Sequence, residues 1–339
     1  MNIYDISRKA GVSTATVSRV INGSSNVSEK TRQVVLAAIE ESGYTPNAFA
    51  RGLGLNTMQT VGILCADCSD PYLARAVYYI EQNLRRGGYD SLLMCTGFEL
   101  DSKQSCLNLL MSKRVDGIIF VGSNYVEHID SANDYIRAAA VSIPVMLVNG
   151  SLSAQGVYST LCDDFAALSE LTERFLRSGR RNLVYIYNSD SYSGRKKLEG
   201  FRSTLDRNAV PPDDRRICRI ASSDASAINE AYAAIERLVR SGVEIDGVIA
   251  SEDIIAIGAL KYARDNGLRI PEDLFAAGFN NSDIALCCEP ELTTVDNRLE
   301  LLCRHSVSAL MAVLSGDTAV PEKAVFSGEI VERKTTAFV

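Results

Sequence analysis

The chain has 339 residues, of which 46% are hydrophobic and 23% are charged, and it carries a net charge of −7. A chain of this length exceeds one small hydrophobic core and predicts two or three domains. No apolar stretch is long enough for a signal peptide or a membrane span, so we exclude secreted and membrane-spanning classes and expect a cytoplasmic protein.

Three short helices are expected in the first 45 residues: Ile3–Ala10, Thr14–Ile21 and a third that follows Ser28 and ends at Gly43. Gly11 opens a tight turn after the first helix, and Ser13 is the expected N-cap of the second. Helix, glycine turn and helix at this spacing form the helix-turn-helix pattern of DNA-binding proteins.

The charge is distributed unevenly along the chain. Residues 1–57 carry a net charge of +2, whereas the remainder carries −9. A basic head on an acidic body is typical of a protein in which only the head meets a polyanion.

Residues 45–57 join this head to the rest of the chain. Pro46 can begin a helix but cannot lie inside one, and Gly52 and Gly54 weaken any helix that forms. A segment of such marginal helicity either becomes ordered on binding a partner or acts as a passive linker, and both interpretations stay open at this point.

From Thr60 onward, apolar strands alternate with amphipathic helices in two series. The first series has expected strands at 60–65, 91–95, 115–121 and 144–148, with helices near 73–87, 102–114 and 127–140. The second has expected strands at 182–187, 216–220, 246–251 and 274–279. This alternation predicts an α/β body of two doubly wound parallel-sheet subdomains, with a ligand cleft between them beyond the carboxyl ends of the strands.

The nine cysteines are scattered and odd in number. Cys65 and Cys68 have the spacing of a redox motif or half of a zinc site, but there is no second such pair, and His128 and His305 are the only histidines. We therefore expect the cysteines to be structural or incidental, and we expect no metal site. No phosphate-binding glycine loop and no catalytic triad is present, so we expect neither an enzyme nor a cofactor.

Residues 3–53, IYDISRKAGVSTATVSRVINGSSNVSEKTRQVVLAAIEESGYTPNAFARGL, resemble the head and hinge of the lac repressor family of bacterial transcription regulators. The segments KRVDGIIFVGS, SEDIIAIGALKYARDNGLRIPEDL and LTTVDN also fall where that family has recurring segments. The resemblance implies a periplasmic-binding-protein-like body. Its domains would be a helix-turn-helix head over 1–45, a hinge over 46–58, an N-terminal subdomain of 59–161 with 296–322, and a C-terminal subdomain of 162–295 with 323–339.

The resemblance also implies how the head meets DNA. The residues matching base-reading positions are Thr14, Ala15 and Arg19, and those matching backbone-contacting positions are Ser13, Thr16, Ser18 and Asn22. The residues matching minor-groove positions of the hinge are Asn47, Ala50 and Leu53. Arginine is suited to guanine O6 and N7, and an apolar wedge such as Leu53 would bend the duplex.

In the body, the resemblance implies a cleft for a small-molecule effector. The matching residues are Asp70, Tyr72, Leu73, Asn149, Ser193, Lys197, Asp253 and Asn280. Tyr72 is suited to stack on a sugar or a base. Asp253 is either a helix cap or a ligand contact, and the sequence does not separate these two roles.

Three of these positions depart from the family pattern. Lys197 stands where the family has arginine, and Asn149 and Asn280 stand where carboxylates are common. Lysine lacks the bidentate fork of arginine, and an amide lacks the charge of a carboxylate. These changes point away from a standard monosaccharide without excluding it.

The expected function is that of a homodimeric transcription regulator that acts as a repressor and binds palindromic operator DNA under the control of a small molecule such as a sugar. The alternative is a cytoplasmic solute-binding or sensor protein that has the same body fold and does not bind specific DNA.

Overall fold

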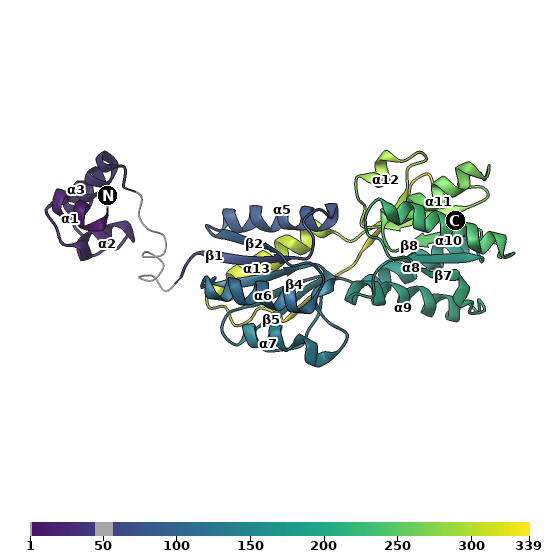
Figure 1. Ribbon diagram of the computed structural model, residues 1–339, viewed down its shortest axis with the longest axis horizontal. Helices are drawn as coiled ribbons and strands as arrows, with labels where there is room; N and C mark the ends of the chain where they lie inside the picture. The colour runs from purple at the N-terminus through teal and green to yellow at the C-terminus, as the bar shows by residue number, and fades with distance from the viewer. Residues whose placement is uncertain (1, 45–56) are drawn as a thin grey trace.

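The computed structural model describes residues 2–44 and 57–339 (Figure 1). The hinge residues Asn47, Ala50 and Leu53 lie outside these ranges, so the interpretations placed on them stay predictions. The helices of the head are α1 (Ile3–Ala10), α2 (Thr14–Ile21) and α3 (Glu29–Ser42), which confirms the predicted helix-turn-helix order.

The head folds around a small apolar core, which consists of Ile6, Ala10, Val17, Val20, Val35 and Ala38. Gly11 ends α1 with φ of +64°, a left-handed conformation that glycine adopts at little cost. Ser13 caps α2 through a hydrogen bond from the Thr16 amide at 3.2 Å. The turn and the cap therefore set the angle between the two helices.

The first lobe of the body contains a six-stranded parallel sheet in the order β11-β5-β4-β3-β1-β2. Its strands are β1 (Thr60–Cys65), β2 (Asp90–Cys95), β3 (Gly117–Val121), β4 (Val145–Val148), β5 (Val157–Cys162) and β11 (Lys323–Phe326). The covering helices are α5 (Pro71–Arg86) and α13 (Leu299–Leu314) on one face, and α6 (Leu100–Ser112) and α7 (Asp134–Ala140) on the other.

The second lobe repeats this architecture around a sheet in the order β12-β10-β9-β8-β6-β7, in which only β12 is antiparallel. Its strands are β6 (Leu183–Tyr187), β7 (Ile217–Arg219), β8 (Gly247–Ala250), β9 (Phe275–Phe279), β10 (Thr293–Asp296) and β12 (Glu329–Val331). The helices α8 (Asp164–Arg177) and α9 (Tyr192–Arg207) pack on one face, and α10 (Ser226–Arg240) and α11 (Asp253–Asp265) on the other. A short helix, α12 (Ile284–Cys287), follows β9.

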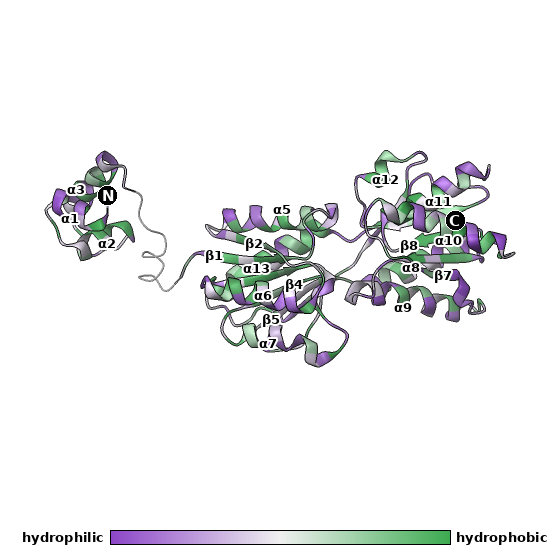
Figure 2. Cartoon of the chain, viewed as in Figure 1, coloured by the Kyte–Doolittle hydropathy of each residue, from purple (hydrophilic) through white to green (hydrophobic). Residues whose placement is uncertain are grey.

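Burial on both faces explains why the central strands are almost continuously apolar. In β1, Ile63 packs toward α5 and α13, while the next residue, Leu64, packs toward α6. Figure 2 shows hydrophobic strands in the middle of each lobe and hydrophilic residues on the outer faces of the helices. This confirms the predicted pair of doubly wound sheets.

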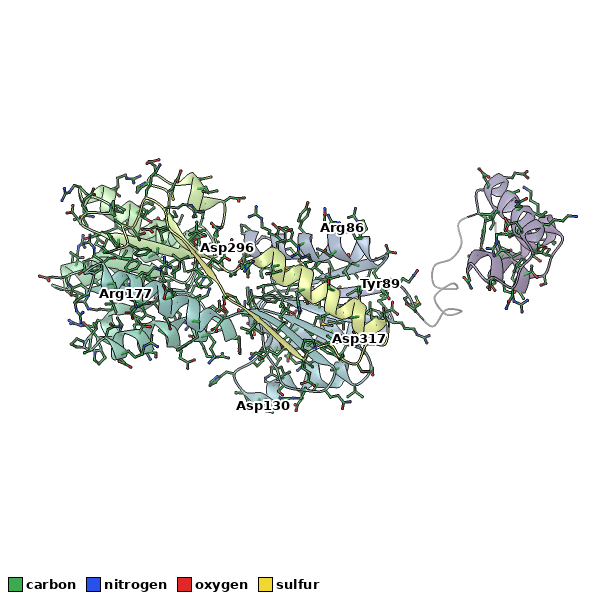
Figure 3. The ribbon with its side chains drawn as sticks, turned by 180° about the vertical axis from the view of Figure 1, so that it is seen from behind. Arg86, Tyr89, Asp130, Arg177, Asp296 and Asp317 are labelled. Carbon is green, nitrogen blue, oxygen red and sulfur yellow. The ribbon has the colours of Figure 1, made fainter. Side chains whose placement is uncertain are left out.

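The chain crosses between the lobes after β5, after β10 and after β11. Figure 3 shows Asp296, the last residue of β10, at the junction of the two lobes. The two lobes are thus each built from discontinuous segments.

The structure differs from the sequence prediction in three places. Strands β5 and β10 were not expected as strands. The helix expected at 127–140 begins at Asp134, because the Asn133 side chain accepts a hydrogen bond from the Glu127 amide at 2.7 Å and closes a loop. Strand β11 pairs with β5, so Lys323–Phe326 belongs to the first lobe, whereas the prediction returned the chain to the second lobe at residue 323.

Candidate functional site

The predicted base-reading residues lie on the outer side of α2. Val17 and Val20 are buried in the core of the head, whereas Ala15 and Arg19 are exposed and Thr14 is half-buried. Three other head cations are ion-paired, in the contacts Arg8–Asp5, Lys9–Glu41 and Arg32–Glu29. Within the described ranges neither Arg19 nor Lys30 has such a pair, and of these two cations only Arg19 lies on α2.

The predicted backbone-contacting residues lie along the same helix. The hydroxyls of Ser13 and Thr16 are 2.9 Å apart and hydrogen-bonded, Ser18 is half-buried, and Asn22 is the C-cap residue of α2. Ser13 therefore has a capping role in addition to the phosphate contact expected of it. The DNA contacts of all these residues stay predictions.

A cavity of about 910 Å³ lies between the two lobes of the body. This volume falls within the range of about 300–1,000 Å³ that is usual for small-molecule sites. All the residues that the sequence assigned to an effector cleft line it, namely Asp70, Tyr72, Leu73, Asn149, Ser193, Lys197, Asp253 and Asn280. The fold therefore gathers these distant residues into one place.

The hydroxyl of Tyr72 is the centre of a polar network that joins the lobes. It accepts hydrogen bonds from Asn149 Nδ2 and, at 2.8 Å, from Asn297 Nδ2. Asn297 Nδ2 also donates to Asn280 Oδ1 at 3.1 Å. Burial raises the pKa of Tyr72 well above its usual value, so its hydroxyl stays protonated. The amides at 149 and 280 are thus engaged with protein partners.

Asp70 and Leu73 form the beginning of α5. Asp70 Oδ1 accepts hydrogen bonds from the amides of Tyr72 at 2.8 Å and Leu73 at 3.0 Å, which makes Asp70 the N-cap. Burial raises the pKa of Asp70, against the effect of these hydrogen bonds. Leu73 is buried and packs in the core beneath α5. Both residues therefore stabilise the start of α5 in addition to lining the cavity.

Lys197 contributes a buried positive charge from α9. Its Nζ donates to the Ser251 carbonyl at 3.0 Å and lies 3.7 Å from the centre of the Phe279 ring. One hydrogen bond uses one of the three donors of an ammonium group. Burial raises the pKa of Asp164, while the positive charge of Lys197 and the Ser193 hydroxyl on the same helix act in the opposite direction.

Asp253 does not cap the helix that it begins. The N-cap position of α11 is Glu252, whose side chain makes no capping hydrogen bond. The carboxylate of Asp253 instead accepts hydrogen bonds from the Thr294 hydroxyl and from the amide and hydroxyl of Ser282, both at 2.7 Å. Burial raises its pKa to about 6, while these hydrogen bonds act in the opposite direction. The capping interpretation is therefore wrong, and most of the acceptor capacity of Asp253 is already used.

Sequence reasoning missed Glu252, Ser251 and Asn297, which also line the cavity. Burial raises the pKa of Glu252 to about 7, although nearby Lys197 lowers it. Ser251 Oγ and Asn297 Oδ1 are buried and have no hydrogen-bond partner among the described residues. Unpartnered buried polar atoms are costly, so atoms of this kind in a cavity indicate where a polar ligand binds. The sequence did carry a signal for them, because Ser251 and Glu252 begin the segment SEDIIAIGALKYARDNGLRIPEDL and Asn297 ends the segment LTTVDN.

Direct contacts also join the two lobes through residues that line the cavity, and we call this group of contacts the rim. Ser123 Oγ donates to Ser191 Oγ at 2.9 Å, and Ser189 Oγ donates to Asn124 Oδ1 at 3.3 Å. On another side, Arg75 of α5 forms an ion pair with Asp283 at 3.0 Å. These contacts join residues of the first lobe to residues of the second.

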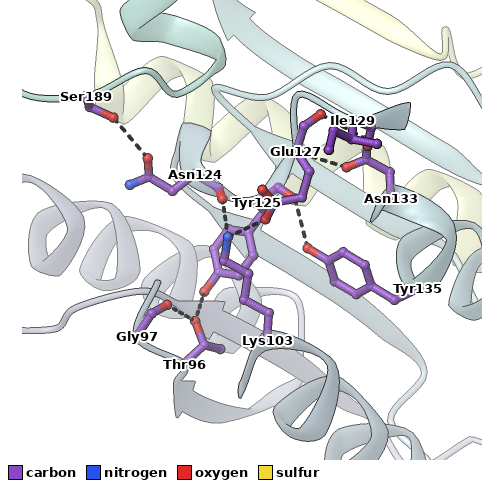
Figure 4. A network of polar contacts seen from close by, with 10 residues as sticks. All are labelled: Thr96, Gly97, Lys103, Asn124, Tyr125, Glu127, Ile129, Asn133, Tyr135 and Ser189. Atoms are coloured by element: carbon purple, nitrogen blue, oxygen red, sulfur yellow. Dashed lines mark hydrogen bonds and ion pairs between the residues drawn. The ribbon is translucent and has the colours of Figure 1, made fainter. Parts of the chain in front are cut away.

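The first-lobe side of this rim is held from within by Lys103. Figure 4 shows its Nζ between the Asn124 carbonyl and the Glu127 carboxylate, both at 2.6 Å. Lys103 is 3% exposed, and its ammonium also lies 5.7 Å from the centre of the Tyr125 ring. The loop that carries Asn124 is therefore anchored by a buried charge.

Two further observations concern classes of site. In the part of the chain that the structure describes, no helix combines the length and the apolar character needed to cross a membrane. Among residues 2–44 and 57–339, no group of three or more acidic, histidine or cysteine side chains is arranged to hold a metal ion.

Comparison with known proteins gives matches over the whole chain. Residues 2–47 match the family model for bacterial regulatory proteins of the lacI family, and residues 172–336 match a periplasmic binding protein-like domain. An HTH-type transcriptional regulator of Lachnoclostridium phytofermentans is 50% identical over 338 residues and covers 100% of both chains. Catabolite control protein A of Priestia megaterium is 32% identical and covers 87% of both chains.

Solved structures agree with these matches. The lac repressor dimer bound to operator and the anti-inducer ONPF has a TM-score of 0.87 at 25% identity and covers 99% of both chains. The complex of the transcriptional regulator CelR with cellobiose has a TM-score of 0.71 at 25% identity, also over 99% of both chains.

Proposed function

The chain belongs to the lacI family of bacterial regulatory proteins, and we propose that it is a dimeric repressor whose affinity for a palindromic operator is controlled by a small molecule bound between the lobes of its body. The cavity between the lobes carries this proposal, because its lining includes every residue that the sequence assigned to an effector. The similarity to a lac repressor dimer on its operator supports the dimer. Because operator DNA lies in the bacterial cytoplasm, we propose that the protein acts in the cytoplasm.

The chemistry of the cavity favours a neutral molecule with several hydroxyl groups, such as a sugar. Ser251 Oγ and Asn297 Oδ1 are buried and unpartnered among the described residues, and Lys197 keeps donors in reserve. A hydroxyl group both donates and accepts, so it satisfies sites of either kind. The volume of about 910 Å³ leaves room for a disaccharide, and the similar CelR structure contains cellobiose.

The operator is tested by selecting random DNA duplexes with the purified full-length protein, at low and at moderate salt. We expect a palindrome whose half-sites lie about one helical turn apart, as two-fold related recognition helices require. Binding that fades with salt and enriches no sequence, with and without cell extract, would contradict a specific operator reader. A protein lacking residues 1–57 is the matched control. If the full-length protein is a repressor, the truncated protein should enrich no DNA sequence. If it is a solute-binding protein, the truncation should change none of its binding.

The effector is tested on the selected duplex, labelled and followed by fluorescence anisotropy during titration with monosaccharides and disaccharides, cellobiose first. We expect one of them to change the affinity for DNA. Ser251→Ala removes an unpartnered hydroxyl in the cavity and should weaken that response without changing DNA affinity in the absence of sugar. Ser306→Ala is the matched control, because Ser306 Oγ is also buried and unpartnered among the described residues but lies outside the cavity lining.

A further inference from the structure

A second cavity lies within the second lobe. Its volume is about 730 Å³, inside the usual range of about 300–1,000 Å³ for small-molecule sites. It is bounded by the second half of α9, by residues 210–216, and by Leu183 and Ile217, the first residues of β6 and β7. It therefore lies at the opposite edge of the sheet from the cavity between the lobes, and the two cavities share no lining residue.

One wall of the second cavity is apolar. Leu183 and Phe201 are fully buried, and Leu205, Val210 and Ile217 are half-buried and pack against the same core. Half-buried apolar side chains lose more contact with water when an apolar group fills the space beside them. This wall therefore favours a ligand with an apolar part.

Two arginines of the lining are already engaged with the protein. Arg215 Nη2 lies 2.8 Å from the Asp213 carboxylate, and Arg216 Nε lies 3.5 Å from it. Arg216 also donates to the Glu244 carbonyl at 2.7 Å. These contacts hold the segment that follows α9, and they leave Asp213 without a free charge for a ligand.

Three other charged side chains of the lining keep bonding capacity. Arg181 donates to the Asn208 carbonyl at 3.1 Å through Nη2 alone. Arg202 Nη2 lies 3.2 Å from Asp214, whose side chain is 91% exposed, so this ion pair is weak. Among the residues that the structure describes, the Asp206 carboxylate has neither an ion pair nor a hydrogen bond. The second cavity therefore offers a ligand both a cation and an anion.

The spacing of these charges limits the ligand. Arg202 and Asp206 lie four residues apart on α9, so their Cβ atoms are about 5–6 Å apart on one face of the helix. An α-amino acid carries its carboxylate and its ammonium group on a single carbon atom. A guanidinium group is suited to bind the carboxylate through two parallel hydrogen bonds, and a carboxylate is suited to accept from the ammonium group.

We propose that the second cavity binds an amino acid with an apolar side chain. Its carboxylate contacts Arg202 and Arg181, its ammonium group contacts Asp206, and its side chain packs on the apolar wall. An apolar acid without the amino group would bring its carboxylate close to Asp206 with no compensating charge. An apolar amine without the carboxylate would face Arg202 in the same way. Only the molecule with both groups satisfies both side chains.

The test uses the full-length protein and free L-tryptophan, without DNA or sugar, so its outcome is independent of the repressor function proposed above. Because the chain contains no tryptophan, the fluorescence anisotropy of the added amino acid is recorded without a protein background. We expect saturable binding at one site per chain and displacement by L-leucine. Tryptamine lacks the carboxylate and indole-3-propionate lacks the amino group, so each should bind about tenfold more weakly or less.

Two outcomes of this titration would overturn the proposal. The first is no saturable binding of L-tryptophan together with no heat of binding for L-leucine in calorimetry. The second is an affinity for tryptamine or indole-3-propionate that equals the affinity for tryptophan.

Variants assign the binding to the second cavity. Arg202→Gln and Asp206→Asn should each weaken tryptophan binding by about tenfold or more, and because both side chains are exposed, the melting curves should stay unchanged. Asp214→Asn is the matched control. It makes the same change in the same lining, but Asp214 competes for Arg202, so this variant should not weaken binding. Unchanged binding in Arg202→Gln and Asp206→Asn, or an equal loss in Asp214→Asn, would overturn the proposal.

Discussion

Replacing Lys103 by methionine should destabilise the first lobe by about 3 kcal/mol. The substitution leaves the Glu127 carboxylate and the Asn124 carbonyl without the ammonium that lies 2.6 Å from each. Removing one partner of a buried ion pair costs about 3–5 kcal/mol. We take the low end of this range because the Glu127 side chain is 28% exposed and water can solvate part of its charge.

Urea unfolding followed by far-ultraviolet circular dichroism measures the loss, and a double-mutant cycle assigns it to the pair. Glu127→Gln alone should also destabilise the protein, and the double variant should be more stable than the sum of the two losses predicts. Arg137→Met is the matched control. Its partners Asp130 and Asp134 are 83% and 71% exposed, so it should cost less than about 1 kcal/mol. Additive losses in the Lys103–Glu127 cycle would refute the reasoning.

A second measurement distinguishes anchoring of the rim from simple stability. Because Asn124 accepts a hydrogen bond from Ser189 of the second lobe, Lys103→Met should speed hydrogen exchange in residues 187–191. Arg137→Met should leave that segment unchanged. Equal exchange in both variants would mean that Lys103 stabilises its own lobe without holding the rim.

Three other outcomes follow from the head and the cavity. Arg19→Ala should abolish the preference for one base pair, at a cost of about 1–3 kcal/mol in DNA-binding free energy measured by duplex competition. Lys30→Ala should instead weaken binding to all sequences alike. An unchanged base preference in Arg19→Ala would exclude Arg19 from base reading. Gly11→Ala should destabilise the head by about 1 kcal/mol, measured as faster amide exchange in α1 and α2, because its φ is +64°. Glu252→Gln should raise the melting temperature at pH 8, and this difference from the wild-type protein should disappear toward pH 5. The pKa of Glu252 is about 7 in the folded protein against a usual 4.5. The wild-type protein therefore loses stability as the pH rises between these two values. A constant difference in melting temperature across that range would contradict the assignment to Glu252.

The head was predictable because its signals are local. Gly11 at a left-handed helix end and Ser13 at an N-cap act on residues within one turn of helix, so the sequence alone places α1 and α2. The apolar strands of the body, which alternate with helices along the chain, were predictable because each is also a local pattern. Strand β11 was not, because its alternating burial is that of an edge strand, and only pairing with β5 assigns it to the first lobe.

The cavity depended on contacts that no local pattern contains. The Tyr72 hydroxyl meets Asn149 and Asn297, which lie 77 and 225 positions away in the sequence. The resemblance to a family indicated which residues line the cavity, but it did not indicate which of their polar atoms have hydrogen-bond partners. Asn280 and Asp253 line the cavity, but their acceptors are engaged with protein partners. The unpartnered atoms belong to Ser251 and Asn297.

The weakness of the contacts between the lobes would allow the proposed effector to control their arrangement. The Arg75–Asp283 pair has side chains that are 45% and 77% exposed, and exposed pairs of this kind contribute about 0–1 kcal/mol. The two hydroxyl contacts at the rim are each neutral hydrogen bonds, worth about 0.5–1.5 kcal/mol. A ligand that satisfies Ser251 and Asn297 while contacting the first lobe adds interactions of similar or greater strength. Because a ligand shifts an equilibrium only by its differential affinity for the two states, weak direct contacts leave the balance to the ligand.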